Sequence, residues 1–354
     1  MAIYKLLDIS STLPIKNKFG AKVANGVPIL TIKDMDNLNN LSGKFIDKNE
    51  FSQIINYGFL EKGDILVGRV GTIGKSIILD ELSFYPSDNF ILIRANKNFV
   101  FPKYLHFFIK KNFTYIKTLN RGSTQPLITK TDLMNMSIDL PNLSTQTNII
   151  NIIEPFEKIL NNFIEKISSL KEYIKNNYLL NKSNNFIKIL DLCNLYSQKY
   201  NNQQFYSDTS IVTDSMIDMT KLELIDIRKS RANLTPKNKS IVFSKLKGSN
   251  KVLPIYNSIY NNIVFSTGFF NISSKYNLFL YGYLLSEEFL KEKKVNSVGT
   301  LMEGLSVETL KNIKFKKPNN NYIDNENVLE LLSFYILIIN KIKEMIAKII
   351  QILI

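Results

Sequence analysis

The chain has 354 residues, of which 45% are hydrophobic, and this length is enough for two or three domains with sizeable cores. The single cysteine excludes an internal disulfide framework, and one histidine with one cysteine cannot build a zinc site of the usual kinds. The formal net charge of +14 at pH 7 indicates a polyanionic partner, most commonly nucleic acid, although a composition rich in Asn, Lys and Ile also follows from an AT-biased genome.

Nothing in the sequence indicates a membrane segment. The first residues lack a charged region followed by a long apolar run, and the most apolar stretch, 331–339, is too short to span a bilayer. Because the lone cysteine suits a reducing compartment, these features predict a cytoplasmic protein that contacts no membrane.

The first 143 residues contain short β-rich segments separated by turn signals. Residues 27–32 and 65–67 are predicted strands, and the second leads into a glycine-punctuated loop or hairpin at 68–75. Pro102 is predicted to open a helix that extends to about Lys117. A β-rich module therefore precedes the first long helix.

Two stretches repeat apolar residues at alternating spacings of four and three, which is the a/d seam of a heptad repeat. The first seam consists of Ile149, Ile153, Phe156, Leu160, Phe163, Ile167, Leu170 and Ile174. The second consists of Val328, Leu332, Tyr335, Ile339, Ile342, Ile346, Ile349 and Leu353. An average period of 3.5 asks for a partner helix wound left-handedly, so the two helices are predicted to form an antiparallel coiled coil within the chain.

The second half of the chain repeats the first half in the same order. Residues 188–192 repeat 5–9, and residues 241–245 repeat 65–69. Four later residues align without gaps with four residues of the first half, namely Leu305, Leu310, Phe315 and Pro318 with Ile128, Leu133, Ile138 and Pro141. The glycine-rich loop is replaced at 245–249. The pattern predicts an internal duplication whose loops differ, as expected of two modules that read different targets.

Catalytic motifs are unsupported on each route tested. Residues 69–76 approach a phosphate-binding P-loop, but Arg69 stands where the first glycine belongs, so a turn presenting Arg69 and Lys75 to an anion is the better interpretation. The chain has no pair of glycines two residues apart, no Pro-Pro and no Pro-Asp, which leaves methyl transfer and metal-dependent nuclease chemistry without their motifs. His106 is predicted to be a packed structural residue, and Glu292 to Lys294 a solvated helix face.

Polar and basic loops are the candidate nucleic-acid-binding sites. Gln can bond adenine with two hydrogen bonds, Ser and Thr can serve phosphates or bases, and Lys and Arg neutralise phosphates. The alternative for each loop is a plain connection or a solvated face. The candidates are Lys16, Lys18, Lys22, Arg69, Lys75, Arg121, Ser123, Thr124 and Gln125 in the first module, and Arg228, Arg231, Lys245, Lys247 and Lys251 in the second.

In this order the elements resemble the specificity subunit of type I restriction-modification systems. The resemblance rests on residues 63–67 with Gly71 and Gly74, then on residues 122–125, Ile128, Leu133, Ile138, Leu140, Pro141 and Gln146, which lead into the heptad helix. Two departures stand out: Thr145 replaces the family's Glu before Gln146, and the second copy lacks the Gln after Pro318.

The resemblance implies an α+β fold with two β-rich target-recognition domains in tandem, each followed by a long helix. The expected boundaries are 1–143 and 184–320 for the recognition domains, and 144–183 and 321–354 for the spacer helices. It implies a non-catalytic subunit without a cofactor. Each domain would read half of a bipartite target on double-stranded DNA, and the helices would set the spacing.

The partners implied by the resemblance are two methyltransferase (modification) subunits, docked on the helices, and motor-nuclease (restriction) subunits. The alternative is a non-catalytic coiled-coil scaffold with two duplicated binding modules for protein or RNA. A third interpretation, an enzyme fused to a recognition domain, is disfavoured by the missing glycine loops.

Overall fold

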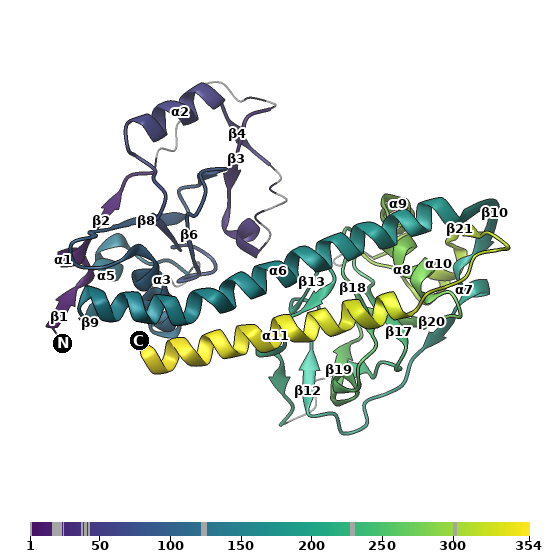
Figure 1. The fold of residues 1–354 in the computed structure, drawn as a ribbon. Coiled ribbons are helices and arrows are strands. Elements are labelled where there is room, and N and C mark those ends of the chain that lie inside the picture. Colours follow the sequence, from purple (N-terminus) through teal and green to yellow (C-terminus); the bar gives the residue numbers. More distant parts are fainter. Residues whose placement is uncertain are drawn as a thin grey trace. The chain divides into compact units, whose positions relative to one another are not determined.

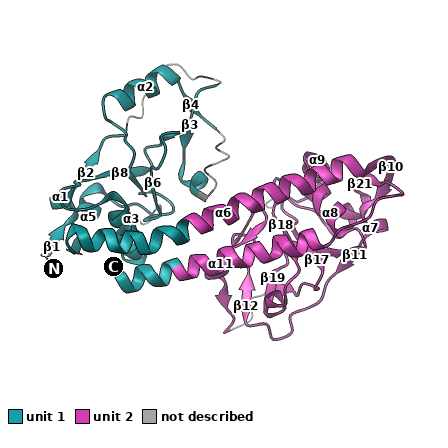
Figure 2. Cartoon of the chain, viewed as in Figure 1, with its two compact units in different colours: residues 1–157, 346–354 teal, residues 158–345 magenta. Residues whose placement is uncertain are grey.

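The computed structural model describes residues 2–15, 23, 25–36, 38, 41, 43–121, 126–226, 231–299 and 303–354. They form two compact units, unit 1 of residues 1–157 with 346–354, and unit 2 of residues 158–345 (Figure 2). Each unit combines sheets with helices, so the predicted α+β class is confirmed.

Unit 1 is built around a four-stranded antiparallel sheet. Its strands, in spatial order, are β2 (Ser10–Leu13), β8 (Phe90–Ala95), β5 (Ile65–Gly68) and β6 (Ser76–Ile78). The uninterrupted apolar run of β5 is fully buried, as expected for a strand covered on both faces. A smaller sheet has the order β4 (Phe45–Ile46), β3 (Val27–Leu30) and β7 (Tyr85–Pro86), and β1 (Ala2–Lys5) pairs with β9 (Ser137–Leu140).

The helices of the described part of unit 1 are short, apart from its share of the two long helices. They are α1 (Leu6–Ile9), the 3-10 helix η1 (Ile32–Asp36), α2 (Lys48–Asn56), α3 (Pro102–Lys111), α4 (Phe113–Thr118) and α5 (Lys130–Met134). The single helix predicted from Pro102 to Lys117 is wrong, because α3 ends at Asn112, where φ is −88° and ψ is 14°. The Asn112 side chain donates to the carbonyl of Phe108 at 2.9 Å, which is the competition with helix continuation typical of Asn.

Unit 2 repeats this architecture. Its main sheet has the order β11 (Asn194–Tyr196), β20 (Phe269–Ser273), β17 (Ser240–Ser244) and β18 (Val252–Ile255), which matches the order of the sheet in unit 1. A second sheet has the order β15 (Glu223–Leu224), β12 (Phe205–Ser207), β19 (Ile263–Ser266) and β16 (Ala232–Leu234). Two strand pairs complete it: β10 (Lys182–Lys188) with β21 (Lys314–Pro318), and β13 (Val212–Thr213) with β14 (Met216–Ile217).

The short helices of unit 2 also follow the first copy. They are α7 (Ile189–Leu192), η2 (Met219–Lys221), η3 (Ser258–Asn262), α8 (Asn277–Leu284), α9 (Glu287–Asn296) and α10 (Val307–Asn312). The Leu6 amide of α1 donates to the Met136 carbonyl at 3.0 Å, and the Ile189 amide of α7 donates to the Ile313 carbonyl at the same distance. Equivalent atoms thus make equivalent bonds, which confirms the predicted tandem repeat.

The helix that follows the main sheet, α3 in unit 1 and α8 in unit 2, is held by a different side chain in each unit. Gln146 is buried, accepts a hydrogen bond from the Phe101 amide at 2.9 Å, and donates to the carbonyls of Phe99 and Pro141, also at 2.9 Å. In unit 2, Asp324 accepts from two amides at the N-terminus of α8, at 2.9 and 3.1 Å. The missing Gln of the second copy is therefore replaced by a carboxylate that satisfies helix-terminal amides in the same way.

The two predicted long helices are α6 (Leu143–Asn181) and α11 (Asn327–Leu353) (Figure 1). Every residue of both predicted seams is buried or half-buried. Within unit 2, the rings of Phe163 and Tyr335 meet edge to face with centroids 5.2 Å apart, and the Tyr322 hydroxyl donates to Asn177 at 3.0 Å. Asn177 follows Phe163 along α6, whereas its partner Tyr322 precedes Tyr335. The two segments therefore run antiparallel there, as predicted. The four predicted segment boundaries stay a prediction, since both units divide within these helices.

α11 buries a wider face than a coiled-coil seam requires. Leu329 and Ile336 lie off the predicted seam and belong to the core of unit 2. The buried Asn340 donates to the Ile217 carbonyl and accepts from the Met219 amide, both at 2.8 Å. No helix in the described parts of the chain is long and apolar enough to cross a bilayer.

The seam gives a stability prediction. Ile167→Asp and Ile342→Asp each place a carboxylate in an apolar contact, so each should lower the free energy of unfolding by about 3 kcal/mol or more. Ile159 lies on α6 but is exposed, and Ile159→Asp is the matched control with an expected change below about 0.5 kcal/mol. Urea denaturation followed by circular dichroism measures all three, and equal midpoints for the seam and control variants would contradict the pairing.

Candidate nucleic-acid interface

The predicted glycine-punctuated loop is a hairpin that joins β5 to β6. The Gly68 amide donates to the Lys75 carbonyl at 2.8 Å, and the Gly74 amide donates to the Gly68 carbonyl at 2.9 Å. Gly71 and Gly74 have φ of +73° and +80°, and a Cβ on Gly68 would lie 2.7 Å from the Thr72 carbonyl oxygen. The glycines are therefore needed to close the turn, and a strand follows it where a P-loop would continue into a helix.

A second segment, distant in sequence, is bound to this hairpin through main-chain atoms. The Arg69 amide donates to the Asn89 carbonyl at 2.9 Å, and the Arg69 carbonyl accepts from the Ile128 amide at 3.0 Å. Val70 bridges to Leu127, whose carbonyl accepts from the Arg121 amide at 3.0 Å. The loop after β5 and the segment before α5 thus form one surface that contains Arg69 and Arg121.

The cations of this surface have different environments. Arg121 is exposed and forms an ion pair with Asp132, whose pKa is lowered by the Thr129 hydroxyl and then by Arg121. Arg69 is half-buried, and its Nε has no hydrogen-bond partner among the described residues. Lys75 is also half-buried. The structure brings the neighbourhoods of these three predicted residues together.

Seven predicted site residues lie outside the described residues. They are Lys16, Lys18, Lys22, Ser123, Thr124, Gln125 and Arg228. Their roles in binding stay predictions.

The loop of unit 2 has the same main-chain frame. The Ser244 amide donates to the Lys251 carbonyl at 3.0 Å, as Gly68 does to Lys75. The Lys245 amide donates to the Gly268 carbonyl at 2.8 Å, and the Lys245 carbonyl accepts from Leu305 at 2.9 Å. A bridge from Leu246 to Gly304 and a bond from Lys247 to Glu303 complete the correspondence with the first unit.

The four described cations predicted for the second interface lie around this loop. Arg231 is exposed, and its carbonyl accepts from the Thr267 amide at 3.0 Å, next to the residue that receives the Lys245 bond. Lys245 stands over the Phe270 ring at 4.4 Å from its centroid, and burial lowers its pKa. Lys247 pairs with Glu303, and Lys251 donates to the Thr209 carbonyl. Three of these ammonium groups therefore have partners within the protein.

One residue of this site was missed in the sequence. The run from Glu292 to Lys294 was predicted to be a solvated face, but Lys293 is only 1% exposed and its ammonium donates to the carbonyls of Ser244 and Ser249. Lys294 alone of the two lysines is exposed. The charge pattern contained no signal for this burial, because apolar and charged neighbours alternate irregularly on α9.

The Gly63-Asp64 motif before β5 is structural. The buried Asp64 carboxylate accepts two hydrogen bonds from the Arg94 guanidinium, from Nε and from Nη2, both at 2.7 Å, and one from the Glu61 amide at 2.8 Å. Hydrogen bonding to the Asp64 carboxylate, which accepts from Arg94, raises the pKa of the Arg94 guanidinium. This two-pronged pair fixes the turn that leads into β5.

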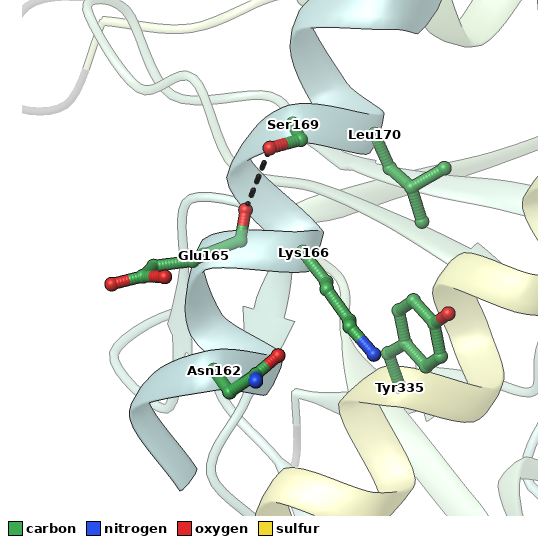
Figure 3. Close-up of a pocket in the computed structure, with 6 residues that line it drawn as sticks. All are labelled: Asn162, Glu165, Lys166, Ser169, Leu170 and Tyr335. Atoms are coloured by element: carbon green, nitrogen blue, oxygen red, sulfur yellow. Dashed lines mark hydrogen bonds between the residues drawn. The ribbon is translucent and has the colours of Figure 1, made fainter. Parts of the chain in front are cut away.

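A shallow hollow lies on α6 and α11 within unit 2, with a volume of about 440 Å³. It is lined by Asn162, Glu165, Lys166, Ser169, Leu170 and Tyr335 (Figure 3). The lining contains neither histidine nor cysteine, and Lys166 lies over the Tyr335 ring at 5.9 Å from its centroid. Across the described residues, no three His, Cys, Asp or Glu side chains are placed to hold a metal ion.

Comparison with known proteins assigns the class. Residues 3–172 match the profile of the type I restriction modification DNA specificity domain. The provisionally named type I restriction enzyme specificity subunit S.HindORF215P of Haemophilus influenzae is 31% identical over 123 residues, which are 34% of this chain and 31% of that protein. The type I restriction enzyme HindI specificity subunit of the same species is 32% identical over 105 residues, 28% of this chain and 23% of that protein. The chain thus spans less than a third of the length of these relatives.

Two solved structures are also similar to the chain. The type I restriction-modification system S subunit from M. genitalium is 13% identical with a TM-score of 0.48, covering 99% of this chain and 95% of that one. The HsdS subunit from Thermoanaerobacter tengcongensis is 14% identical with a TM-score of 0.28, covering 82% and 75%. The class therefore rests on the domain match at residues 3–172.

A DNA specificity domain of the type I restriction-modification class therefore occupies residues 3–172. Within its matched residues the chain is similar to the specificity subunits of type I restriction-modification systems.

The single histidine gives a pH prediction. His106 is buried in α3 with Nε2 3.3 Å from the Ser76 carbonyl oxygen, as expected for a structural residue. Burial, reinforced by Lys110, lowers its pKa from 6.5 to about 3. A lowered folded-state pKa means that stability is complete above the unfolded value of 6.5 and is lost as the pH falls towards 3.

Lowering the pH from 7 to 5 should therefore reduce the free energy of unfolding of unit 1 by about 2 kcal/mol, because His106 takes up a proton on unfolding. Hydrogen exchange of α3 amides, corrected for intrinsic rates, measures the loss. His106→Gln keeps a donor for the Ser76 carbonyl but does not titrate, so its pH dependence should be smaller by that amount. An unchanged dependence in this variant would refute the assignment.

Proposed function

We propose that the chain is the DNA-reading subunit of a type I restriction-modification complex and that it recognises a bipartite target on double-stranded DNA. The observation that carries the proposal is the duplicated main-chain frame, which holds a basic loop in the same place in both units. Two copies of one frame suit two short blocks of sequence, one for each unit. The net charge of +14 supports a polyanionic partner.

The two blocks should differ, because the two loops offer different groups. The first interface has Arg69 and Lys75 on a glycine-built hairpin and Arg121 on the segment that is bound to this hairpin. The second has Arg231 and three lysines that already have protein partners, Lys245, Lys247 and Lys251. A cation that is held by a neighbour has a fixed direction, which favours a specific contact over a mobile one to phosphate.

The long helices are the proposed docking surface for two methyltransferase (modification) subunits, which would supply the methyl donor. Several large apolar side chains are exposed on them, among them Ile152, Ile159, Tyr173, Leu331 and Phe334. Exposed apolar groups on otherwise polar helix faces suit a protein partner. Motor-nuclease (restriction) subunits would join this assembly, and the chain itself would carry no catalysis and no cofactor. The length of the helices would set the spacing between the two blocks.

Exchanging one module tests the bipartite proposal. Replacing residues 1–143 with the equivalent segment of a relative should change one block of the methylated sequence and leave the other unchanged, because each unit has its own core and its own loop. Methylome mapping of cells that express the chain with its modification subunits measures both blocks. The purified chain alone is the control, and it should leave DNA unmethylated.

A single continuous methylated site would contradict the two-reader proposal. Absence of any salt-dependent binding to duplex DNA would favour the alternative, a coiled-coil scaffold with two binding modules for protein or RNA.

Arg121 tests the first interface alone. Arg121→Ala should weaken recognition of the first block by about 1–3 kcal/mol if the guanidinium leaves Asp132 for a base edge. Lys130→Ala removes an exposed charge from the adjacent α5 and is the matched control. Affinity is measured on duplexes that carry each block intact or substituted. A loss that is uniform over all sequences would assign Arg121 to a phosphate contact.

A further inference from the structure

Lys293 of α9 is a buried lysine beneath the second basic loop. It is 1% exposed, and its Nζ donates to the Ser249 carbonyl at 2.7 Å and also to the Ser244 carbonyl. No acidic side chain among the described residues forms an ion pair with it. Burying a lysine without a carboxylate partner costs free energy, and hydrogen bonds from its ammonium group to buried acceptors offset part of that cost. Burial lowers the pKa of Lys293 to about 7, and the amine can donate to the carbonyls in either protonation state.

The two carbonyls belong to opposite arms of the same loop. Ser244 is the last residue of β17, and Ser249 lies in the segment that leads to Val252, the first residue of β18. The Ser249 amide donates to the Leu246 carbonyl at 3.1 Å, so the lysine holds both the start of the loop and its inner turn. Lys245 and Lys247 lie between the two bound carbonyls. The backbone positions of Lys245 and Lys247 therefore depend on the two hydrogen bonds from Lys293.

The first unit closes the equivalent loop by another means. By the matched hydrogen bonds, Ser244 and Lys247 stand where unit 1 has Gly68 and Gly71, and in the same register Asn250 falls at the place of Gly74. Beneath the first loop an apolar side chain, that of Ile116 in α4, lies 3.0 Å from the place of a Cβ on Gly74. The second loop has a single residue of positive φ, Gly248 at +73°. Without the other glycines, it is held from below by an ammonium group.

We propose that Lys293 is a positioning residue that fixes the backbone of loop 244–251 and thereby determines how strictly unit 2 discriminates its DNA block. The proposal rests on the proposed function, since it presumes that this loop reads DNA. Lys293 is too deeply buried to reach DNA itself. It acts through Lys245, Lys247 and Lys251, whose direction it sets.

Lys293→Met tests the proposal in the full chain assembled with its modification subunits. Met has a similar length but cannot donate, whereas Lys294→Met removes the same charge from the exposed neighbour and is the matched control. Lys293→Met should lower discrimination between the correct and the substituted second block by about tenfold or more, as expected for the loss of charged hydrogen bonds. Discrimination at the first block should be unchanged, and Lys294→Met should behave as the unmodified chain.

A graded variant protects the test against simple unfolding. Lys293→Gln retains an amide that can donate to one of the two carbonyls, so its effect on the second block should lie between those of Lys and Met. Unaltered discrimination at the second block in Lys293→Met would overturn the proposal. An equal loss at both blocks in Lys293→Gln would also overturn it, because a general loss of stability does not select one block.

Hydrogen exchange separates this proposal from the proposed function. The amides of Lys247 and Ser249 should exchange faster in Lys293→Met than in Lys294→Met, while those of Gly71 and Gly74 in the first loop stay unchanged. If the unmodified assembly methylates no bipartite site, the proposed function fails, and this measurement still decides the role of Lys293. Equal exchange of the second loop in both variants would refute that role.

Discussion

The burial of one broad face of α11 is the contact on which unit 2 depends. Leu332 and Ile339 face the seam with α6, while Leu329 and Ile336 extend the same apolar surface into the core of the β-rich part. A coiled-coil seam needs only two positions in seven, whereas a helix that also covers a sheet needs a wider stripe. The helix pairing is therefore continuous with the core of the unit, and the buried Asn340 fixes α11 against the end of β14 at Ile217.

The architecture could be predicted because it depends on periodicity and on order. The 3.5-residue spacing of Ile167 and its neighbours is visible in the chain itself, and so is the recurrence of an apolar strand before each loop. The break at Asn112 could not be predicted in the same way, because a polar side chain that competes for its own helix carbonyl leaves the apolar pattern unchanged. The replacement of Gln146 by Asp324 was invisible for another reason, since different side chains in differently spaced positions satisfy similar amides.

The sequence could predict which basic residues belong to the candidate site, but it could not predict how the fold brings them together. Arg69 and Arg121 were selected as basic residues in loops, but the bridge between Val70 and Leu127 that brings their segments together joins residues too far apart for any local pattern. The environment of each charge was equally hidden. Lys247 with Glu303 and Lys293 with two carbonyls have the same local signature of lysines in a polar run, yet one lies at the surface and the other in the interior. Burial is decided by what packs over a residue, and this is a property of the fold.

The frame around each loop is made of main-chain atoms, and this has a consequence for how the protein can change. A carbonyl or amide is present whatever the side chain, so substitutions at Arg69 or Lys245 leave these bonds intact, with proline as the exception because it lacks the donor. Selection can therefore alter the chemistry displayed by a loop while its scaffold persists. After a duplication, such a frame lets one copy change its target while the other keeps the old one. The different residues at corresponding positions, Gly71 and Lys247, are an example of such a change.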